Sequence, residues 1–167
     1  MRQGVYLILI TLLTHHSTMS QVQSSSYNTL LKTLLSHSVS EISVDEAREK
    51  LGSVVFLDSR SKEEFDVSHI EGALHVGYDN FELTSVEGLD KKREVVVYCS
   101  VGYRSEKITE KLHEAGFKNV HNLYGGIFEW KNQGNEVMTP EGKPTEDVHA
   151  YNRLWGIWLK KGNRVYD

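Results

Sequence analysis

The sequence predicts an α/β domain with a mainly parallel central sheet and helices on both of its faces. Two short, continuous apolar runs, residues 54–57 and 95–98, are typical of strands that are buried on both sides. Segments with helical periodicity lie between and after these runs, so strands and helices alternate along the chain. The length of 167 residues suits one domain of ordinary size with additions at both ends.

Composition and charge argue against several classes of function. The formal net charge is −4, so we expect an acidic soluble surface and no nucleic-acid partner, which would call for a basic stripe with interleaved aromatic residues. The chain has one cysteine, Cys99, which excludes an internal disulfide and disfavours a Cys/His structural zinc site. No glycine-rich nucleotide-binding fingerprint occurs. We therefore expect neither a metal nor a cofactor.

The N-terminus predicts a signal peptide over residues 1–20. Arg2 precedes an unbroken apolar run at residues 5–13, which has the length of a signal-peptide core and falls short of the roughly 20 residues that span a bilayer. Thr18 and Ser20 are small enough for a cleavage site. We expect export to the periplasm or the exterior, with no membrane span after cleavage. The alternatives are an uncleaved segment that anchors the chain to a membrane, or a buried N-terminal element.

Residues 21–39 connect this segment to the domain. The composition of residues 21–26, mostly serine and glutamine, predicts a polar linker. Residues 27–37 predict a short amphipathic helix that packs on the domain or simply leads into it. The apolar positions at helical spacing are Leu30, Leu31, Leu34 and Leu35.

The domain proper is expected over residues 40–135. Ser43 and Glu46 have the spacing of a capping box, which predicts the start of a helix that Gly52 ends. The first apolar run follows and ends at Asp58, as a buried parallel strand would.

Three more segments lead up to the second apolar run. Residues 61–65 predict the start of another short helix, residues 73–76 a second strand, and residues 88–93 a charged turn. The apolar run at residues 95–98 is the strongest strand pattern in the chain.

The rest of the domain repeats the pattern. Residues 105–115 predict a helix closed by Gly116, residues 119–122 a short strand, and residues 127–133 a final domain helix.

Residues 136–167 form a C-terminal extension. Residues 139–148 are rich in proline, glycine and charge, which predicts an extended connection. We expect a C-terminal helix over residues 150–160 that docks an aromatic stripe on the domain or offers it to a protein partner. Its apolar positions at helical spacing are Tyr151, Leu154, Trp155, Trp158 and Leu159.

Cys99 is the candidate nucleophile. It stands at the carboxyl end of the strongest predicted strand, where ligands bind in open α/β sheets, and a helix follows it. Unpaired N–H groups at a helix N-terminus favour negative charge and lower the pKa of a thiol placed there. Gly102 lets the loop curl, and Arg104 adds a permanent cation. The alternative is an inert buried cysteine, which is common in proteins.

Residues 40–135 resemble a rhodanese domain in four motifs that occur in order. These are Asp58-Ser59-Arg60 after a strand; Phe65 with the turn His69-Ile70-Glu71-Gly72-Ala73; the loop from Cys99 to Arg104, as Cys-x-x-Gly-x-Arg; and Gly125-Gly126 followed by Trp130. The sequence departs from the family pattern at Glu71, where the family often has proline. The resemblance does not cover the first forty or the last thirty residues.

The resemblance implies a sulfurtransferase that works through a persulfide. The Cys99 thiolate would take a sulfane sulfur from a donor such as thiosulfate and pass it to cyanide or a thiol. Backbone N–H groups of the loop would hold the terminal sulfur and its charge. The loop residues that this assigns to binding are Ser100, Val101, Gly102, Tyr103, Arg104 and Ser105.

Supporting roles are implied for Asp58 and Arg60. Asp58 would orient Arg104 or cap a loop. Arg60 would reach the turn at His69 in a structural ion pair, or would contact the substrate. Tyr103 either gates the pocket or faces solvent.

Three other classes of protein share features with this sequence. Cysteine-dependent phosphatases and arsenate reductases place one residue more between Cys and Arg, and phosphate needs that wider cradle, so the shorter loop here favours sulfur. Dithiol oxidoreductases need a second thiol, which this chain lacks. A non-catalytic binding or sulfide-sensing module stays open, because the aromatic C-terminal segment could serve a protein partner.

Overall fold

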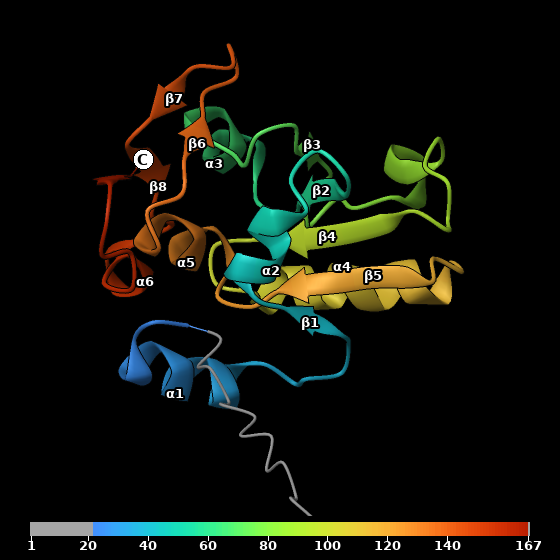
Figure 1. Cartoon of the computed structure of the whole chain (residues 1–167), viewed down its shortest axis with the longest axis horizontal. Helices are drawn as coiled ribbons and strands as arrows, with labels where there is room; N and C mark the ends of the chain where they lie inside the picture. Colours follow the sequence, from blue (N-terminus) through green and yellow to red (C-terminus); the bar gives the residue numbers. More distant parts are fainter. Residues whose placement is uncertain (1–21, 167) are drawn as a thin grey trace, which may run out of the picture.

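The computed structural model describes residues 22–166, and its centre is a parallel sheet of five strands in the order β1-β5-β4-β2-β3 (Figure 1). This confirms the predicted fold class. The predicted signal peptide lies outside the described residues. The strands are β1 (Glu41–Ile42), β2 (Val55–Asp58), β3 (Leu74–His75), β4 (Glu94–Tyr98) and β5 (Asn119–Leu123).

The central strand β4 is buried on both faces of the sheet. Val95, Val96 and Val97 have no exposed surface, as the continuous apolar run predicted. Successive side chains alternate between two hydrophobic clusters, with Val96 on one side and Val95 and Val97 on the other. The register aligns Asp58 of β2 with Tyr98 of β4, so both strands end at the same edge of the sheet.

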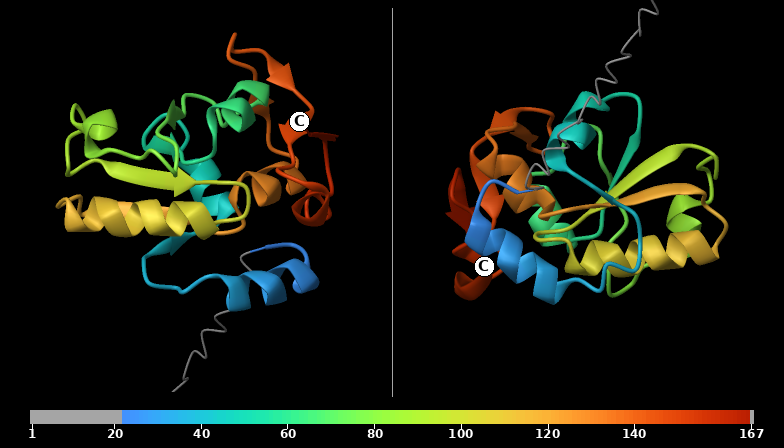
Figure 2. Two further views of the ribbon diagram at one scale, coloured as in Figure 1. Left: turned by 180° about the vertical axis from the view of Figure 1, so that it is seen from behind. Right: turned by 60° about the horizontal axis from the view of Figure 1, so that its bottom comes forward.

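Helices cover both faces, as Figures 1 and 2 show. Apolar side chains of α2 (Val44–Glu49) and α5 (Gly126–Asn132) join the cluster that contains Val96. Those of α4 (Tyr103–Glu114) and the 3-10 helix η1 (Leu83–Val86) join the opposite cluster. The sheet is therefore the middle layer of three.

Local sequence sets the start of two short helices. Ser43 and Glu46 form the predicted capping box at the start of α2. Ser61 and Glu64 form a second one at the start of α3 (Lys62–Val67). In both boxes the serine side chain accepts from the glutamate N–H, and the glutamate side chain accepts from the serine N–H.

The N-terminal segment packs on the domain, which corrects the prediction of a polar linker. Val22 is fully buried, and α1 (Ser25–Leu34) begins two residues earlier and ends three residues earlier than predicted. The Tyr27 hydroxyl donates to the carbonyl of Gly125 at 2.9 Å. The Gln23 N–H donates to Glu129 Oε1 at 2.8 Å. These contacts hold the segment against α5. Its polar composition does not prevent this packing, because backbone N–H groups can bond to a neighbouring element as well as to water.

The C-terminal extension differs most from the prediction. In place of an extended connection and a helix over residues 150–160, the chain forms a hairpin and then a pair of parallel strands around one short helix. Tyr151 lies in the left-handed region at φ +62°, and Asn152 caps α6, so the helix cannot begin at residue 150. The elements are β6 (Val137–Met138), β7 (Pro144–Thr145), β8 (Asp147–His149), α6 (Arg153–Gly156) and β9 (Asn163–Val165).

The apolar residues of the extension divide between the interior and the surface. Leu159 is buried and Trp158 stacks on Tyr27, with ring centroids 5.3 Å apart, so the extension docks on the N-terminal helix (Figure 2). Leu154 is 72% exposed. The predicted aromatic stripe is therefore only partly buried. Within residues 22–166, no helix is both long and apolar enough to cross a membrane.

Candidate active site

The predicted nucleophile lies in a tight loop between β4 and α4. Cys99 directly follows β4, and Gly102 caps α4 with φ at +115°, a conformation that glycine adopts without strain. Cys99 is 1% exposed and forms part of the lining of a pocket of about 450 Å³. The structure therefore brings the thiol, the helix N-terminus and a cavity together.

The loop directs a backbone hydrogen-bond donor at the sulfur. The N–H of Gly102 donates to Cys99 Sγ at 3.1 Å, and the Ser105 hydroxyl oxygen lies 3.5 Å from the same sulfur. The Gly102 N–H favours negative charge on the sulfur, whereas the single proton of the Ser105 hydroxyl is taken by Asn122 Oδ1 at 2.6 Å.

Asn122, at the carboxyl end of β5, holds the loop in this shape. Its Nδ2 donates to the carbonyl of Gly102 at 3.0 Å, and its Oδ1 lies 2.6 Å from the Ser105 hydroxyl. Asn122 is fully buried. Sequence reasoning missed its role, although a polar residue near the end of a buried strand was a signal that could have found it.

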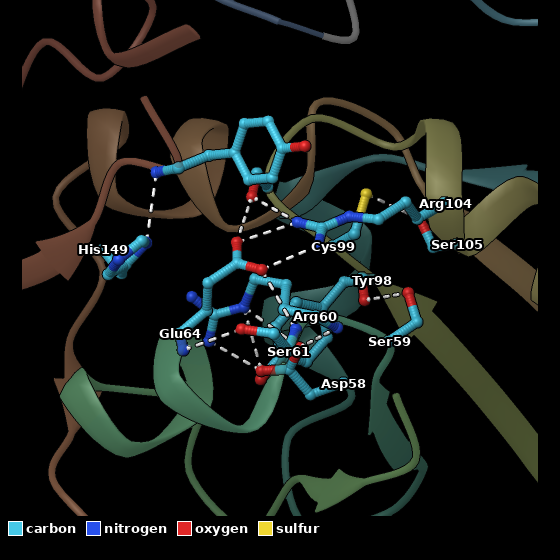
Figure 3. Close-up of polar contacts among 12 residues, drawn as sticks. Asp58, Ser59, Arg60, Ser61, Glu64, Tyr98, Cys99, Arg104, Ser105 and His149 are labelled. Carbon is cyan, nitrogen blue, oxygen red and sulfur yellow. Dashed lines mark hydrogen bonds and ion pairs between the residues drawn. The ribbon is translucent and has the colours of Figure 1, made fainter. Parts of the chain in front are cut away.

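Glu64 of α3 orients Arg104, so of the two roles predicted for Asp58 the orientation of Arg104 does not hold. Arg104 Nη1 donates to Glu64 Oε2 at 2.7 Å, and Nη2 donates to Oε1 at 2.8 Å (Figure 3). The Ser100 hydroxyl accepts from Arg104 Nη2 at 2.9 Å and donates to Glu64 Oε1 at 3.0 Å. A bidentate pair with a bridging hydroxyl fixes the direction of the guanidinium. Glu64 was recognised in the sequence only as part of a predicted helix start.

Glu64 and Arg104 each stabilise the charged form of the other. Burial raises the pKa of Glu64, but the hydrogen bonds and charge of Arg104, with smaller contributions from the Ser61 N–H and Arg60, outweigh it and lower the pKa to about 2. Burial lowers the pKa of Arg104, but the bonds to Glu64 and the charge of the Cys99 sulfur raise it above its ordinary value. Both groups are therefore charged at neutral pH.

Asp58 and Arg60 form a separate, fully buried ion pair. Arg60 Nε lies 3.0 Å from Asp58 Oδ1, and Nη2 lies 2.6 Å from Oδ2. Nη2 also donates to the carbonyl of Ser68 at 2.6 Å, beside His69. Asp58 Oδ1 accepts from the N–H of Arg60, which caps the loop. Of the two predicted alternatives for Arg60, the structure shows the ion pair, since neither residue lines the pocket.

Residues from the N-terminal helix and from the C-terminal extension help to line the pocket. The ring of Tyr151 lies over the guanidinium of Arg104, with 5.2 Å from Arg104 Cζ to the ring centroid. Tyr103 lines the pocket and is 43% exposed, so it lies at the mouth. The lining residues outside the loop are Leu34, Ser61, Glu64, Tyr78, Asp79, His149, Tyr151 and Trp155. Residues 22–166 contain no group of three or more His, Cys, Asp and Glu side chains placed to hold a metal ion.

The buried pair predicts a specific loss of stability in acid. The pKa of Glu64 is about 2 in the folded chain against 4.5 ordinarily, so its contribution is complete above pH 4.5 and is lost as the pH falls towards 2. Because the Glu64 side chain is only 2% exposed, we expect a contribution of about 3 kcal/mol to the free energy of unfolding. Glu64→Gln should lose less stability between pH 5 and pH 3 than the unmodified chain, as measured by urea unfolding. Glu71→Gln, which changes an exposed carboxylate, is the control. An identical pH dependence in the two variants would contradict the assignment.

Comparisons with known proteins agree on the central part of the chain. The profile of a family described as "Rhodanese-like domain" matches residues 43–133. A protein of Pectobacterium carotovorum named tRNA uridine(34) hydroxylase is 42% identical over 91 residues, which cover 52% of this chain and 26% of that protein. Its namesake from Yersinia pestis is 36% identical over the same length and coverage. This chain thus spans about a quarter of the length of these curated relatives.

Solved structures extend the similarity to the fold. A rhodanese-like domain protein from Staphylococcus aureus superposes with a TM-score of 0.53 at 26% identity, covering 60% of this chain and 98% of that one. A thiosulfate sulfurtransferase from Pseudomonas aeruginosa gives a TM-score of 0.54 at 25% identity, covering 63% of this chain and 21% of that one.

Proposed function

The chain belongs to the rhodanese-like domain family, and on that premise we propose that it is a sulfurtransferase that works through a persulfide on Cys99. It moves a sulfane sulfur from a donor such as thiosulfate to cyanide or a thiol. The observation that supports this best is the Gly102 N–H, 3.1 Å from Cys99 Sγ at the start of α4. A donor so placed favours a sulfur that carries negative charge in each half of the cycle.

The first half of the cycle loads the sulfur. The Cys99 thiolate attacks the outer sulfur of thiosulfate, a sulfur–sulfur bond forms to Cys99, and the bond within thiosulfate breaks. Sulfite leaves with the electron pair of that bond. The persulfide anion that remains is stabilised by the loop N–H groups and by the positive end of the α4 dipole.

The second half of the cycle transfers the terminal sulfur to the acceptor. Cyanide or a thiolate attacks the terminal sulfur, and the bond to Cys99 breaks with its electron pair returning to Cys99. Thiocyanate or a new persulfide leaves, and the cycle needs no outside oxidant or reductant. Arg104, fixed by Glu64, is positioned to balance the charge on Cys99 as it returns.

The relatives named tRNA uridine(34) hydroxylase do not extend this proposal to RNA. They share only this domain with the chain, over 26% of their length. A net charge of −4 disfavours a polyanionic partner, so we propose small sulfur compounds as donor and acceptor. A non-catalytic binding or sulfide-sensing module is the second candidate, and the exposed Tyr151, Leu154 and Ile157 of the C-terminal extension, which could contact a protein partner, are the feature that favours it.

Intact-mass measurement tests the proposal directly. After incubation with thiosulfate, the protein should gain about 32 Da, the mass of one sulfur atom, and should lose it again when cyanide is added. Protein alkylated beforehand with iodoacetamide is the control, because Cys99 is the only cysteine in the chain. No gain in mass, or an equal gain in alkylated protein, would refute the persulfide mechanism. A gain that cyanide and thiols cannot remove would favour the binding or sulfide-sensing module.

A further inference from the structure

We propose that Tyr151 of the C-terminal extension is a positioning residue for sulfur transfer, because its ring holds Arg104 in the orientation that serves the Cys99 sulfur. The inference rests on the proposed function and adds to it a residue outside the part of the chain that matches the family, residues 43–133. Tyr151 acts through Arg104 and takes no part in the bonds that form and break at Cys99.

The backbone of Tyr151 adopts a conformation that tyrosine disfavours. Its φ of +62° lies in the left-handed region, where every side chain crowds the backbone and glycine alone is free of this cost. Among residues 22–166, only His37 shares a positive φ without being a glycine. Glycine would suit the backbone at position 151 better, so the presence of tyrosine there points to a role of its side chain.

Burial in the core does not account for this side chain. Tyr151 is 50% exposed, and it belongs to neither of the two hydrophobic clusters in the part of the chain that the structure describes. Its ring lies over the guanidinium of Arg104 instead, with 5.2 Å between Arg104 Cζ and the ring centroid. An aromatic face attracts a cation at this distance. The contact for which the tyrosine is suited is therefore the one with the active-site arginine.

The neighbours of Tyr151 in the chain hold its ring in this place. The N–H of Ala150 donates to the carbonyl of Val165 at 2.9 Å, which continues the pairing of β8 with β9. The side chain of Asn152 accepts from two N–H groups of α6 at 3.0 Å. The backbone cannot leave the left-handed conformation without disturbing one of these contacts. The position of the ring is therefore built into the fold of the extension.

Glu64 and Tyr151 restrain the guanidinium of Arg104 in different ways. The two hydrogen bonds to Glu64, at 2.7 and 2.8 Å, fix one edge of the group but leave it free to tilt about that edge. The Tyr151 ring opposes such a tilt, because it attracts the charge and occupies the space beside Cζ. It also keeps water from part of the Arg104 side chain, which is 18% exposed.

This restraint matters because Arg104 interacts with the Cys99 sulfur. Burial lowers the pKa of Arg104, but the bonds to Glu64 and then the charge of the Cys99 sulfur raise it. A tilted or more hydrated guanidinium would balance the charge on the sulfur less well, both when Cys99 attacks the donor and when the electron pair returns to it. We therefore expect Tyr151 to affect the rates of both halves of the cycle.

Rapid mixing followed by intact-mass measurement tests this for each half of the cycle. The two rates are the loading of Cys99 by thiosulfate and the removal of the added sulfur by cyanide. Tyr151→Leu keeps an apolar side chain and the backbone strain but has no ring, and should lower both rates roughly tenfold. Tyr151→Phe keeps the ring and should stay within about twofold of the unmodified chain. Leu154→Ala, at an exposed position outside the pocket lining, is the control and should change neither rate.

Tyr151→Gly separates the role of the ring from the stability of the fold. Glycine accepts the left-handed conformation, so the midpoint of urea unfolding should fall little or not at all. Both transfer rates should nevertheless fall as far as in Tyr151→Leu. A lower midpoint with unchanged rates is the behaviour of a merely structural residue, and it would overturn the inference.

A double-mutant cycle shows whether Tyr151 acts through Arg104. Arg104→Gln removes the charge and keeps an amide donor for Glu64. In this background Tyr151→Leu should cause almost no further loss of rate, because the ring has no cation to hold. The same loss in both backgrounds would show that the ring acts independently of Arg104. If Arg104→Gln does not fold, the comparison of Tyr151→Phe with Tyr151→Leu decides.

The outcomes separate this inference from the proposed function. If the unmodified chain forms no persulfide, the proposed function fails and this inference with it. If the unmodified chain forms the persulfide and passes its sulfur to cyanide, but Tyr151→Leu does both as fast, this inference alone is overturned.

Discussion

Replacing Cys99 with serine should lower the rate of sulfur transfer by roughly a thousandfold or more while leaving the fold intact. A serine hydroxyl stays protonated at neutral pH and cannot form a sulfur–sulfur bond, so the first half of the cycle has no nucleophile. Serine is slightly smaller than cysteine, and its oxygen can accept from the Gly102 N–H as the sulfur does. Loop geometry should therefore survive the change.

The rate of thiocyanate formation from thiosulfate and cyanide measures this effect. A thermal unfolding midpoint within a few degrees of the unmodified chain would show that the loss is chemical. Cys99→Ala serves as a second variant in case the serine perturbs the buried site, because alanine introduces no polar atom. Retention of more than a tenth of the rate in both folded variants would exclude Cys99 as the nucleophile.

Replacing Gly126 with alanine should have the largest effect on stability. Gly126 begins α5 at φ +58°, and an added Cβ would overlap the carbonyl oxygen of Cys99 and lie 2.6 Å from that of Ser100. Those two carbonyls accept from the N–H groups of Ile127 at 2.9 Å and Phe128 at 3.1 Å. The variant must therefore push the loop away from α5, at a cost of roughly 3 kcal/mol or more in the free energy of unfolding.

Gly52→Ala provides the matched control. Gly52 has φ at +77°, and an added Cβ meets nothing within 4 Å, so it bears the backbone strain without the collision. Its cost should be about 1 kcal/mol. Urea unfolding of both variants measures the difference. The rate of transfer should also fall about a hundredfold in Gly126→Ala, because the thiol is displaced, and should stay unchanged in Gly52→Ala. Equal losses of stability would show that contact with the loop is unimportant.

The fold could be predicted because its signals are local. The run at residues 95–98 has no polar residue to interrupt it, and a strand buried on both faces needs that composition. Ser43 and Glu46 set a helix start through bonds between near neighbours. Cys99 was found for the same reason, since its place at the end of a strand and before a helix is visible along the chain.

The supporting residues of the site could not be predicted, because their partners lie far away in the sequence. Glu46 and Glu64 occupy the same position in two capping boxes, yet only Glu64 is directed at the loop arginine, 40 residues further on. That difference depends on how α3 packs beside the loop. Asn122 of β5 accepts a hydrogen bond from the Ser105 hydroxyl of α4. Nothing in the spacing of these two residues along the chain indicates that bond.

The prediction of a C-terminal helix was wrong for a related reason. Apolar residues at helical spacing predicted it, but β8 pairs with β9 in parallel, so residues 150–162 must form the crossover between the two strands. The left-handed Tyr151 and the cap at Asn152 leave four residues for α6. Pairing over a distance thus outweighed the local periodicity.

The strand order β1-β5-β4-β2-β3 has a consequence for the sequence of events in folding. β4 can pair with β2 early, but the first strand of the sheet pairs with the last one made, and Tyr27 bonds to Gly125 across 98 residues. Contacts of such high order are slow to form, because a long loop must close before they contribute. The contacts that fix the loop around Cys99 have a much lower order, because Asn122 reaches Gly102 across 20 residues and Ser105 across 17. The surroundings of the nucleophile can therefore form before the N-terminal segment docks on the domain.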